Sequence, residues 1–288
     1  VNGEVYTTVS VIDPDSKTVT VTSTSPEVRQ TVSTLDPQGR LTRESIPGLG
    51  ETQYSYNEKG YLASVNYLTD NLESRLWQYT YDDEGNLAAL TDPYNQVYTY
   101  QYNDAGLLIK EIRTGGREIE YGYDANGNMT SVTPPGKAAH NFVYNSVNLK
   151  ESYTPPDTGD ISHSSYAYNL DQQLSAASFG GQNLALTYTG SELGSVSGPH
   201  GNTSYSYDVE GRLSTIMAGA VVQQYTYNGG LVTGETVTGS VPGSISWTFN
   251  NNLLVSSLGV NGTPIAYKYD RDGLLTNVGA LTVTRDMQ

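Results

Sequence analysis

The stretch Tyr79–Leu87, which reads YTYDDEGNL, decides the fold of this chain. It consists of an aromatic residue, any residue, Tyr, an Asp or Asn, two further residues, Gly, one residue and Leu. In a β-strand, residues i and i+2 point to the same face, so the two tyrosines share one face. The side chain of Asp82 can accept hydrogen bonds from amides further along the turn, and Gly85 supplies the positive φ that such turns need. The stretch therefore predicts a strand, a hairpin turn and a return strand that begins at Leu87.

The same pattern recurs with a period near 21 residues, which is the signature of a repeat protein. Close copies read YSYNEKGYL, YQYNDAGLL, YGYDANGNM, YSYDVEGRL and YKYDRDGLL, and looser copies read FVYNSVNL, YAYNLDQQL, LTYTGSEL, YTYNGGL and WTFNNNLLV. The second aromatic residues of the eleven copies are Tyr56, Tyr81, Tyr102, Tyr123, Tyr144, Tyr168, Tyr188, Tyr207, Tyr227, Phe249 and Tyr269. The turn residues of the best copies are Asp82, Gly85, Gly106, Asp124, Gly127, Asp208, Gly211, Asp270 and Gly273. We assign these residues a structural role, and Asn148, which tolerates a positive φ, stands where one copy lacks Gly.

Each unit is long enough for two strands and two turns, and the frame extends backwards to turns at Asp36 and Asp13. About 13 units of this kind predict about 26 strands. We predict an all-β fold, a spiral, solenoid-like antiparallel sheet of tandem hairpins. It forms a single array over residues 1–288, with degenerate repeats in 1–50 and regular repeats in 51–288. Because one hairpin is marginal in water, we expect neighbouring hairpins to bury each other's motif tyrosines.

The composition excludes several classes of protein. The formal net charge is −15, and the basic residues are scattered singly, which disfavours binding to nucleic acid. No run of 18 apolar residues occurs, so we expect no membrane insertion, and the first residues, VNGEVYTTVS, are not typical of a signal peptide. Cysteine is absent, so packing and hydrogen bonds must provide the stability.

The motif copies resemble the YD-repeat, or Rhs-repeat, family over nearly the whole chain, and Tyr205–Leu213 fits its pattern closely. The resemblance implies a spiral β-sheet that forms a hollow shell. In bacterial Rhs and Tc toxins such a shell encloses a hazardous C-terminal domain, and teneurin adhesion receptors carry a similar shell outside the cell. It also implies an exported, extracellular or cell-surface protein, most often bacterial, whose partners are an enclosed or adjacent protein domain and neighbouring repeats.

The chain differs from full-length family members in one respect. It lacks the carboxy-terminal core motif with a self-cleaving aspartate, and the turn at Asp36–Gly39 lies in repeat register. Twenty-six strands spaced about 4.8 Å apart give a contour of roughly 125 Å, or one ring about 40 Å across. One such ring could girdle a small domain but could not seal it in, so we expect a fragment or a short array with a different role.

Catalytic chemistry has a weaker basis in the sequence. His140 or His163 beside a tyrosine such as Tyr144 or Tyr168 could form the His–Tyr acid–base pair of a polysaccharide lyase. The third histidine, His200, has the strand parity of His163 and opposite to that of His140. Loop or strand-end histidines without a catalytic role are the more common case, so our first interpretation assigns no catalytic residue.

The aromatic residues and the acidic turns bear on two kinds of ligand, sugars and calcium. Trp77 and Trp247 could stack on sugar rings, which leaves a carbohydrate- or partner-binding adhesion module as the alternative function. The acidic turns place Gly fourth, whereas a calcium loop places it sixth, so we predict no metal site and no cofactor. The sequence thus favours a non-catalytic structural shell or scaffold segment that encapsulates or displays a neighbouring domain; a glycan-cleaving enzyme is the second alternative.

Overall fold

The computed structural model describes residues 5–69, 73–156 and 163–285. Within these residues the chain forms 27 β-strands and no helix. Each strand from the second to the twenty-sixth pairs antiparallel with the strand before it and the strand after it, so one sheet follows the order of the sequence. The all-β fold of tandem hairpins is therefore confirmed, with 27 strands against the 26 expected.

The strands are four to eight residues long except the last, which has two. The first fourteen are β1 (Thr7–Ile12), β2 (Val19–Thr24), β3 (Gln30–Leu35), β4 (Leu41–Ile46), β5 (Gly50–Tyr56), β6 (Leu62–Leu68), β7 (Ser74–Tyr81), β8 (Leu87–Thr91), β9 (Val97–Tyr102), β10 (Leu108–Arg113), β11 (Arg117–Tyr123), β12 (Met129–Thr133), β13 (His140–Tyr144) and β14 (Lys150–Thr154). The remaining thirteen are β15 (Ser164–Tyr168), β16 (Leu174–Phe179), β17 (Gln182–Thr189), β18 (Glu192–Gly198), β19 (Gly201–Tyr207), β20 (Leu213–Ala218), β21 (Val221–Asn228), β22 (Leu231–Thr238), β23 (Gly243–Phe249), β24 (Val255–Val260), β25 (Thr263–Tyr269), β26 (Leu275–Val278) and β27 (Leu281–Thr282).

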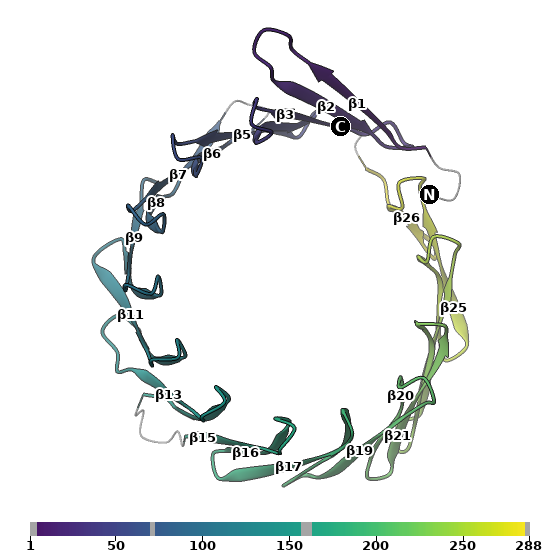
Figure 1. Cartoon of the computed structure of the whole chain (residues 1–288). Helices are drawn as coiled ribbons and strands as arrows, with labels where there is room; N and C mark the ends of the chain where they lie inside the picture. Colours follow the sequence, from purple (N-terminus) through teal and green to yellow (C-terminus); the bar gives the residue numbers. More distant parts are fainter. Residues whose placement is uncertain (1–4, 70–72, 157–162, 286–288) are drawn as a thin grey trace.

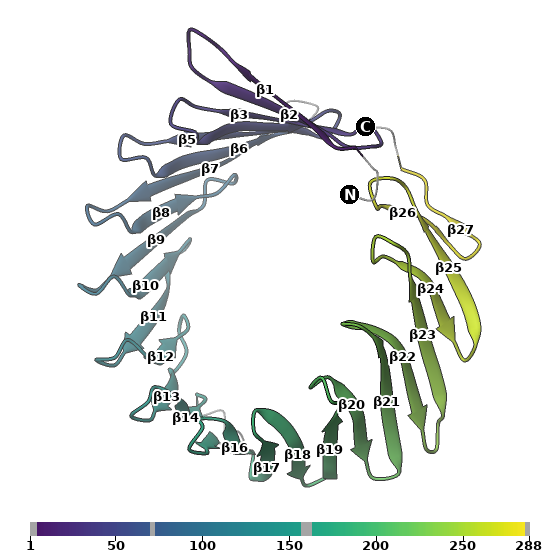
Figure 2. The ribbon, with the colours of Figure 1, turned by 45° about the vertical axis from the view of Figure 1, so that its right-hand side comes forward.

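The sheet curves into a ring whose first and last strands come close together (Figure 1). Turns that follow odd-numbered strands lie on one rim of the ring, and turns that follow even-numbered strands lie on the other (Figure 2). We call the first the Asp rim, because most of its turns begin with Asp or Asn, and the second the far rim. Within the described residues β1 pairs only with β2, and β27 only with β26, so the sheet itself stays open.

The wall of the ring is a single layer, and this corrects the expectation that the motif tyrosines are buried. Among the described residues Ala177, at 5% exposure, is the one buried hydrophobic residue. The second aromatic residue of every motif copy is half-buried. The physical reason is that each tyrosine packs against neighbours in its own sheet, with no second layer placed over that face.

The turns on the Asp rim follow the predicted design. The Asp82 amide donates to the Asn86 carbonyl (3.0 Å), the Gly85 amide donates to the Asp82 carbonyl (3.2 Å), and an Asp82 carboxylate oxygen accepts from the Asn86 amide (2.7 Å). Gly85 has φ +93°, and Asn148 takes the same role with φ +62°, as predicted. The corresponding positions are Gln172 (φ +63°) and Leu253 (φ +60°) in two other copies, where the sequence offered no Gly or Asn.

A β-bulge follows almost every turn on the Asp rim. In β7 and β8, Tyr81 pairs with Leu87 but Thr80 pairs with Ala89, so Ala88 is an extra residue. The same shift occurs in all twelve hairpins from β3–β4 to β25–β26. Bulges bend and twist a strand, so repeating one at the same place in each hairpin gives the sheet a consistent curvature.

Candidate functional site: the tyrosine latch and the ring seam

The hydroxyl of the second motif tyrosine links each hairpin to the one before it. Tyr81 in β7 donates to the carbonyl of Leu62 at the start of β6 (2.9 Å), and Tyr123 in β11 donates to Leu108 in β10 (2.8 Å). We call this contact the tyrosine latch. It also forms from Tyr56 to Leu41, Tyr168 to Lys150, Tyr188 to Leu174, Tyr207 to Leu193, Tyr227 to Leu213 and Tyr269 to Val255.

The latch explains why the repeat uses tyrosine and not phenylalanine at this position. Its acceptor is the carbonyl of the residue next to the bulge, where the ladder within the preceding hairpin is interrupted. The ladder between the two hairpins also ends before it reaches the Asp rim. The hydroxyl therefore supplies a hydrogen bond at the edge of each joint. Within the described residues, Tyr102 and Tyr144 make no such bond, and Phe249 has no hydroxyl to make one.

The carboxylates of the Asp turns are held in their charged form. Hydrogen bonds from the Asn128 side chain, and then from backbone amides of the turn, hold the pKa of Asp124 below its ordinary value against partial desolvation. The pKa of Asp208 is also lowered: burial raises it, but hydrogen bonds from Arg212 outweigh that effect. These aspartates act as turn caps, which agrees with the structural role assigned from the sequence.

The candidate acid–base residues are not brought together. His140 Nδ1 lies 2.8 Å from the hydroxyl of Tyr153, and the two rings stack with centroids 5.9 Å apart. The Tyr168 hydroxyl instead donates to the Lys150 carbonyl at 2.8 Å. His163 is exposed just before β15, at the end of a segment outside the described residues. The one His–Tyr pair of the described chain thus involves a tyrosine that the sequence did not single out.

Both tryptophans lie on the same face of the sheet as the motif tyrosines. Trp77 is half-buried in β7 opposite Val65, and Trp247 is half-buried in β23 opposite Leu258. Their sugar-stacking role remains a prediction. No group of three His, Asp or Glu side chains in the described chain could hold a metal ion, and none of its segments is a helix long and apolar enough to cross a membrane.

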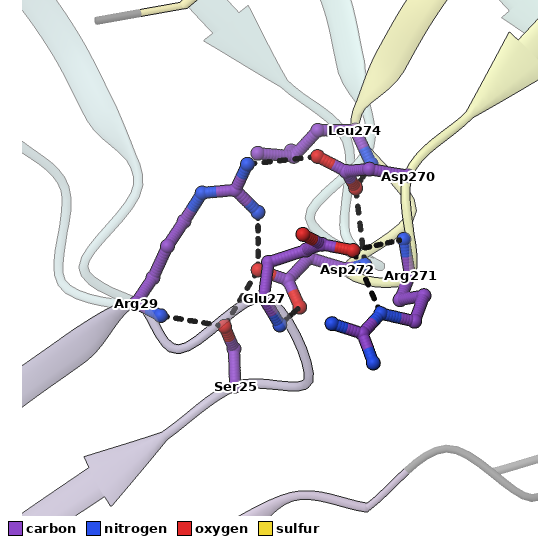
Figure 3. Close-up of polar contacts among 7 residues, drawn as sticks. All are labelled: Ser25, Glu27, Arg29, Asp270, Arg271, Asp272 and Leu274. Carbon is purple, nitrogen blue, oxygen red and sulfur yellow. Dashed lines mark hydrogen bonds and ion pairs between the residues drawn. The ribbon is translucent and has the colours of Figure 1, made fainter. Parts of the chain in front are cut away.

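The second feature of the site is the seam, the contact that completes the ring. It joins the turn Ser25–Arg29, between β2 and β3, to the turn Asp270–Leu274, between β25 and β26 (Figure 3). Arg29 forms ion pairs with Asp270 (2.8 Å) and with Asp272. The Asp272 carboxylate also accepts from the Ser25 hydroxyl (2.6 Å) and from the Glu27 amide (3.0 Å).

A second ion pair runs the other way across the seam, from Arg271 to Glu27 (2.8 Å). Hydrogen bonds from Arg271 hold the pKa of Glu27 below its ordinary value. Burial raises the pKa of Asp272, but bonds from Ser25, the Glu27 amide and Arg29 outweigh it, so that pKa is lowered too. The side chains of Asp270 and Asp272 are only 12% and 9% exposed, so these two carboxylates are shielded from solvent, whereas Glu27 is 32% exposed.

The seam joins opposite rims. The turn Ser25–Arg29 follows the even-numbered strand β2 and lies on the far rim, whereas the turn at Asp270 follows β25 and lies on the Asp rim. After one circuit the sheet has therefore shifted along its axis by about one strand length, so the ring is one turn of a spiral. This agrees with the spiral sheet that the sequence resemblance implied. The seam could not be predicted from the sequence, because its residues look like ordinary turn residues and lie about 245 positions apart.

The family model described as "Teneurin YD-shell" matches residues 1–288. The chain belongs to the teneurin YD-shell family. No curated protein matches it.

Solved structures support the fold of this YD-shell chain. It is similar to the structure described as TcdB2-TccC3-TEV, at 12% identity and a TM-score of 0.59, over 91% of this chain and 19% of that one. It is also similar to TcdB2-TccC3, at 12% identity and a TM-score of 0.57, over 95% of this chain and 20% of that one. At this identity the likeness concerns the fold alone, and the chain spans about a fifth of these relatives.

Proposed function

We propose that this YD-shell chain is a non-catalytic wall segment, one turn of the shell of a larger exported or cell-surface protein of the Rhs type. The shell would enclose or display a neighbouring protein domain. The observation that carries the proposal is the seam, because it turns an open strip of hairpins into a ring with a defined interior. The similar structures support it, since each is about five times longer than this chain.

The dimensions of the ring agree with that role. Twenty-seven strands at about 4.8 Å give a ring about 40 Å across. A 100-residue domain has a radius of gyration of about 13 Å, which for a sphere means about 34 Å across, so a domain of about this size is the largest that the ring could girdle. A single turn leaves both ends of the ring open, so enclosure requires further turns or plugs contributed by the rest of the protein.

Limited proteolysis of the longer protein that carries this array tests the proposal. Enclosure predicts that the neighbouring domain resists protease in the intact protein and is digested faster in the double variant Arg29→Ala, Asp272→Asn. Arg117→Ala is the matched control, because it removes an exposed arginine of the far rim outside the seam. Equal digestion of the neighbouring domain in all three proteins would contradict enclosure. Glycan binding that is lost in Trp77→Ala would favour the adhesion alternative.

A further inference from the structure

One joint in the wall is weaker than the others. The ladder between β12 and β13 has two residue pairs, Ser131 with Asn141 and Val132 with His140. The ladder between β14 and β15 also has two, whereas the other ladders of the described chain, apart from the terminal β26–β27, have three to seven. The hairpin β13–β14 is therefore held to its neighbours by the shortest backbone ladders inside the sheet.

The two short joints differ in the tyrosine latch, which is present between β14 and β15 and missing between β12 and β13. Tyr168 latches β15 to β14 through the Lys150 carbonyl, and the Lys150 ammonium lies 5.3 Å from the Tyr166 ring centre, which adds a second contact across the same joint. Tyr144 in β13 makes no corresponding bond to β12. The loop that crosses this joint contains Pro134 and Pro135, and proline removes a backbone donor from such a loop. The β12–β13 joint thus lacks both a full ladder and a tyrosine latch. At its Asp-rim end it is held by side-chain hydrogen bonds from Asn126 (3.1 Å) and Asn128 (2.8 Å) to Asn148, which join two flexible side chains and not backbone to backbone.

The hairpin on the far side of this joint is itself rigid. Phe142 pairs with Tyr153 across β13 and β14, with ring centres 5.3 Å apart, and His140 stacks on the same tyrosine. The hydrogen bond between His140 and Tyr153 ties the first residue of β13 to β14. Bending is therefore concentrated at the joint before the hairpin and is not spread through it.

The seam has the character of a contact that can be broken. Its bonds are polar and ionic, Arg29 is 41% exposed, and a cavity of about 950 Å³ lies beside it, lined in part by Arg29, Ile46, Leu49 and Asp272. The arginines of the seam reach solvent although Asp270 and Asp272 are shielded, so salt can compete with their ion pairs from the arginine side. Figure 1 places β13 across the ring from the seam. With a weak joint on one side of the ring and a polar contact on the other, the β12–β13 joint can act as a hinge and the seam as the place where the ring opens.

We infer that the ring opens reversibly at the seam by bending at the β12–β13 joint, so that the strands from β1 to β12 and those from β13 to β27 move as two arms. Opening would widen the ring without breaking other ladders, which gives a lateral route for a polypeptide to enter or leave. The inference concerns the chain alone and holds whatever the ring encloses.

Distances between pairs of spin labels test this motion, because the chain has no native cysteine to remove. Thr7→Cys with Leu274→Cys places labels on exposed residues close to the two turns of the seam, since Thr7 pairs with Thr24 beside Ser25. Glu120→Cys with Asn141→Cys spans the β12–β13 joint. Tyr94→Cys with Arg117→Cys lies within the first arm and is the control. We expect a single short seam distance at low salt. In 1 M salt, and in Arg29→Ala with Asp272→Asn, we expect a longer population that is several-fold more abundant.

The three label pairs distinguish the outcomes. The inference holds if the hinge pair broadens in the same samples in which the seam opens, while the pair within the arm stays constant. It is overturned if the seam distance is unchanged in both salt and the double variant. It is also overturned if the seam opens with the hinge pair unchanged, or with the pair in the arm changing as much as the hinge pair. Circular dichroism of each variant checks that the sheet is retained.

Discussion

Replacing a latch tyrosine by phenylalanine isolates one hydroxyl in the wall. In Tyr123→Phe the ring keeps its contacts, and only the 2.8 Å bond to the Leu108 carbonyl is lost. A hydrogen bond contributes about 0.5–1.5 kcal/mol to stability, and the half-buried position lets water reach the freed carbonyl. We therefore expect the free energy of opening the β10–β11 joint to fall by about 1 kcal/mol, which corresponds to about a fivefold change in the opening equilibrium.

Tyr144→Phe is the matched control, because Tyr144 has the same place in its repeat, is also half-buried, and makes no latch. Removing the Tyr144 hydroxyl should leave the free energy of opening the β12–β13 joint nearly unchanged. Hydrogen exchange of peptides that span β10 and β11, compared with those that span β12 and β13, measures the two local effects separately. If both variants accelerated exchange equally, or neither did, the latch would not be the reason for tyrosine at this position.

Three further changes follow from the same geometry. Phe249→Tyr should add a latch to the Val232 carbonyl, the acceptor that the pattern assigns, and raise thermal stability by about 0.5–1 kcal/mol; no gain would show that the acceptor is out of reach. Leu253→Asn should stabilise the protein by about 1 kcal/mol in chemical denaturation, because Leu253 has φ +60° and leucine is strained there; destabilisation would indicate that the exposed leucine makes contacts of its own. The lowered pKa values of Asp270 and Asp272 mean that their stabilisation of the seam is complete above their unfolded value near 3.8 and is lost as the pH falls through the lower folded values. The distance between labels across the seam should therefore be short at pH 7 and lengthen below about pH 3.8, and a short distance at every acid pH would contradict this role.

The parts of the fold that depend on neighbouring residues were predictable from the sequence. The Tyr81 strand, the Asp82 cap and the Gly85 turn lie within nine residues, and Asn148 could replace Gly because its backbone tolerates a positive φ. The latch was not predicted, since its acceptor is a carbonyl beside a bulge in the preceding hairpin. A signal was present, however: ten of the eleven copies have tyrosine at this position and the eleventh has phenylalanine, although leucine or valine could fill the same half-buried place.

Burial and the seam needed the structure itself. Alternation along a strand shows which face holds the tyrosines, but it does not show whether a second layer covers that face. The predicted buried ladder was wrong for this reason. Arg29 and Asp272 read as turn residues in their own repeats, and only the curvature accumulated over the intervening strands brings them together. Small differences in the bend of each hairpin decide whether Arg29 and Asp272 meet, and no local sequence pattern encodes those differences.

The closed spiral turn is tested most directly by small-angle X-ray scattering of this chain at low ionic strength. A single-layered ring of 27 strands about 4.8 Å apart predicts a radius of gyration of about 22 Å, with a pair-distance distribution shifted towards long distances by the hollow centre. A compact globular chain of this length has a radius of gyration of about 19 Å and a symmetrical distribution. We predict the radius of gyration and the distance distribution of the ring. The values of a compact chain would contradict the account, and so would the much longer maximum dimension of an extended ribbon.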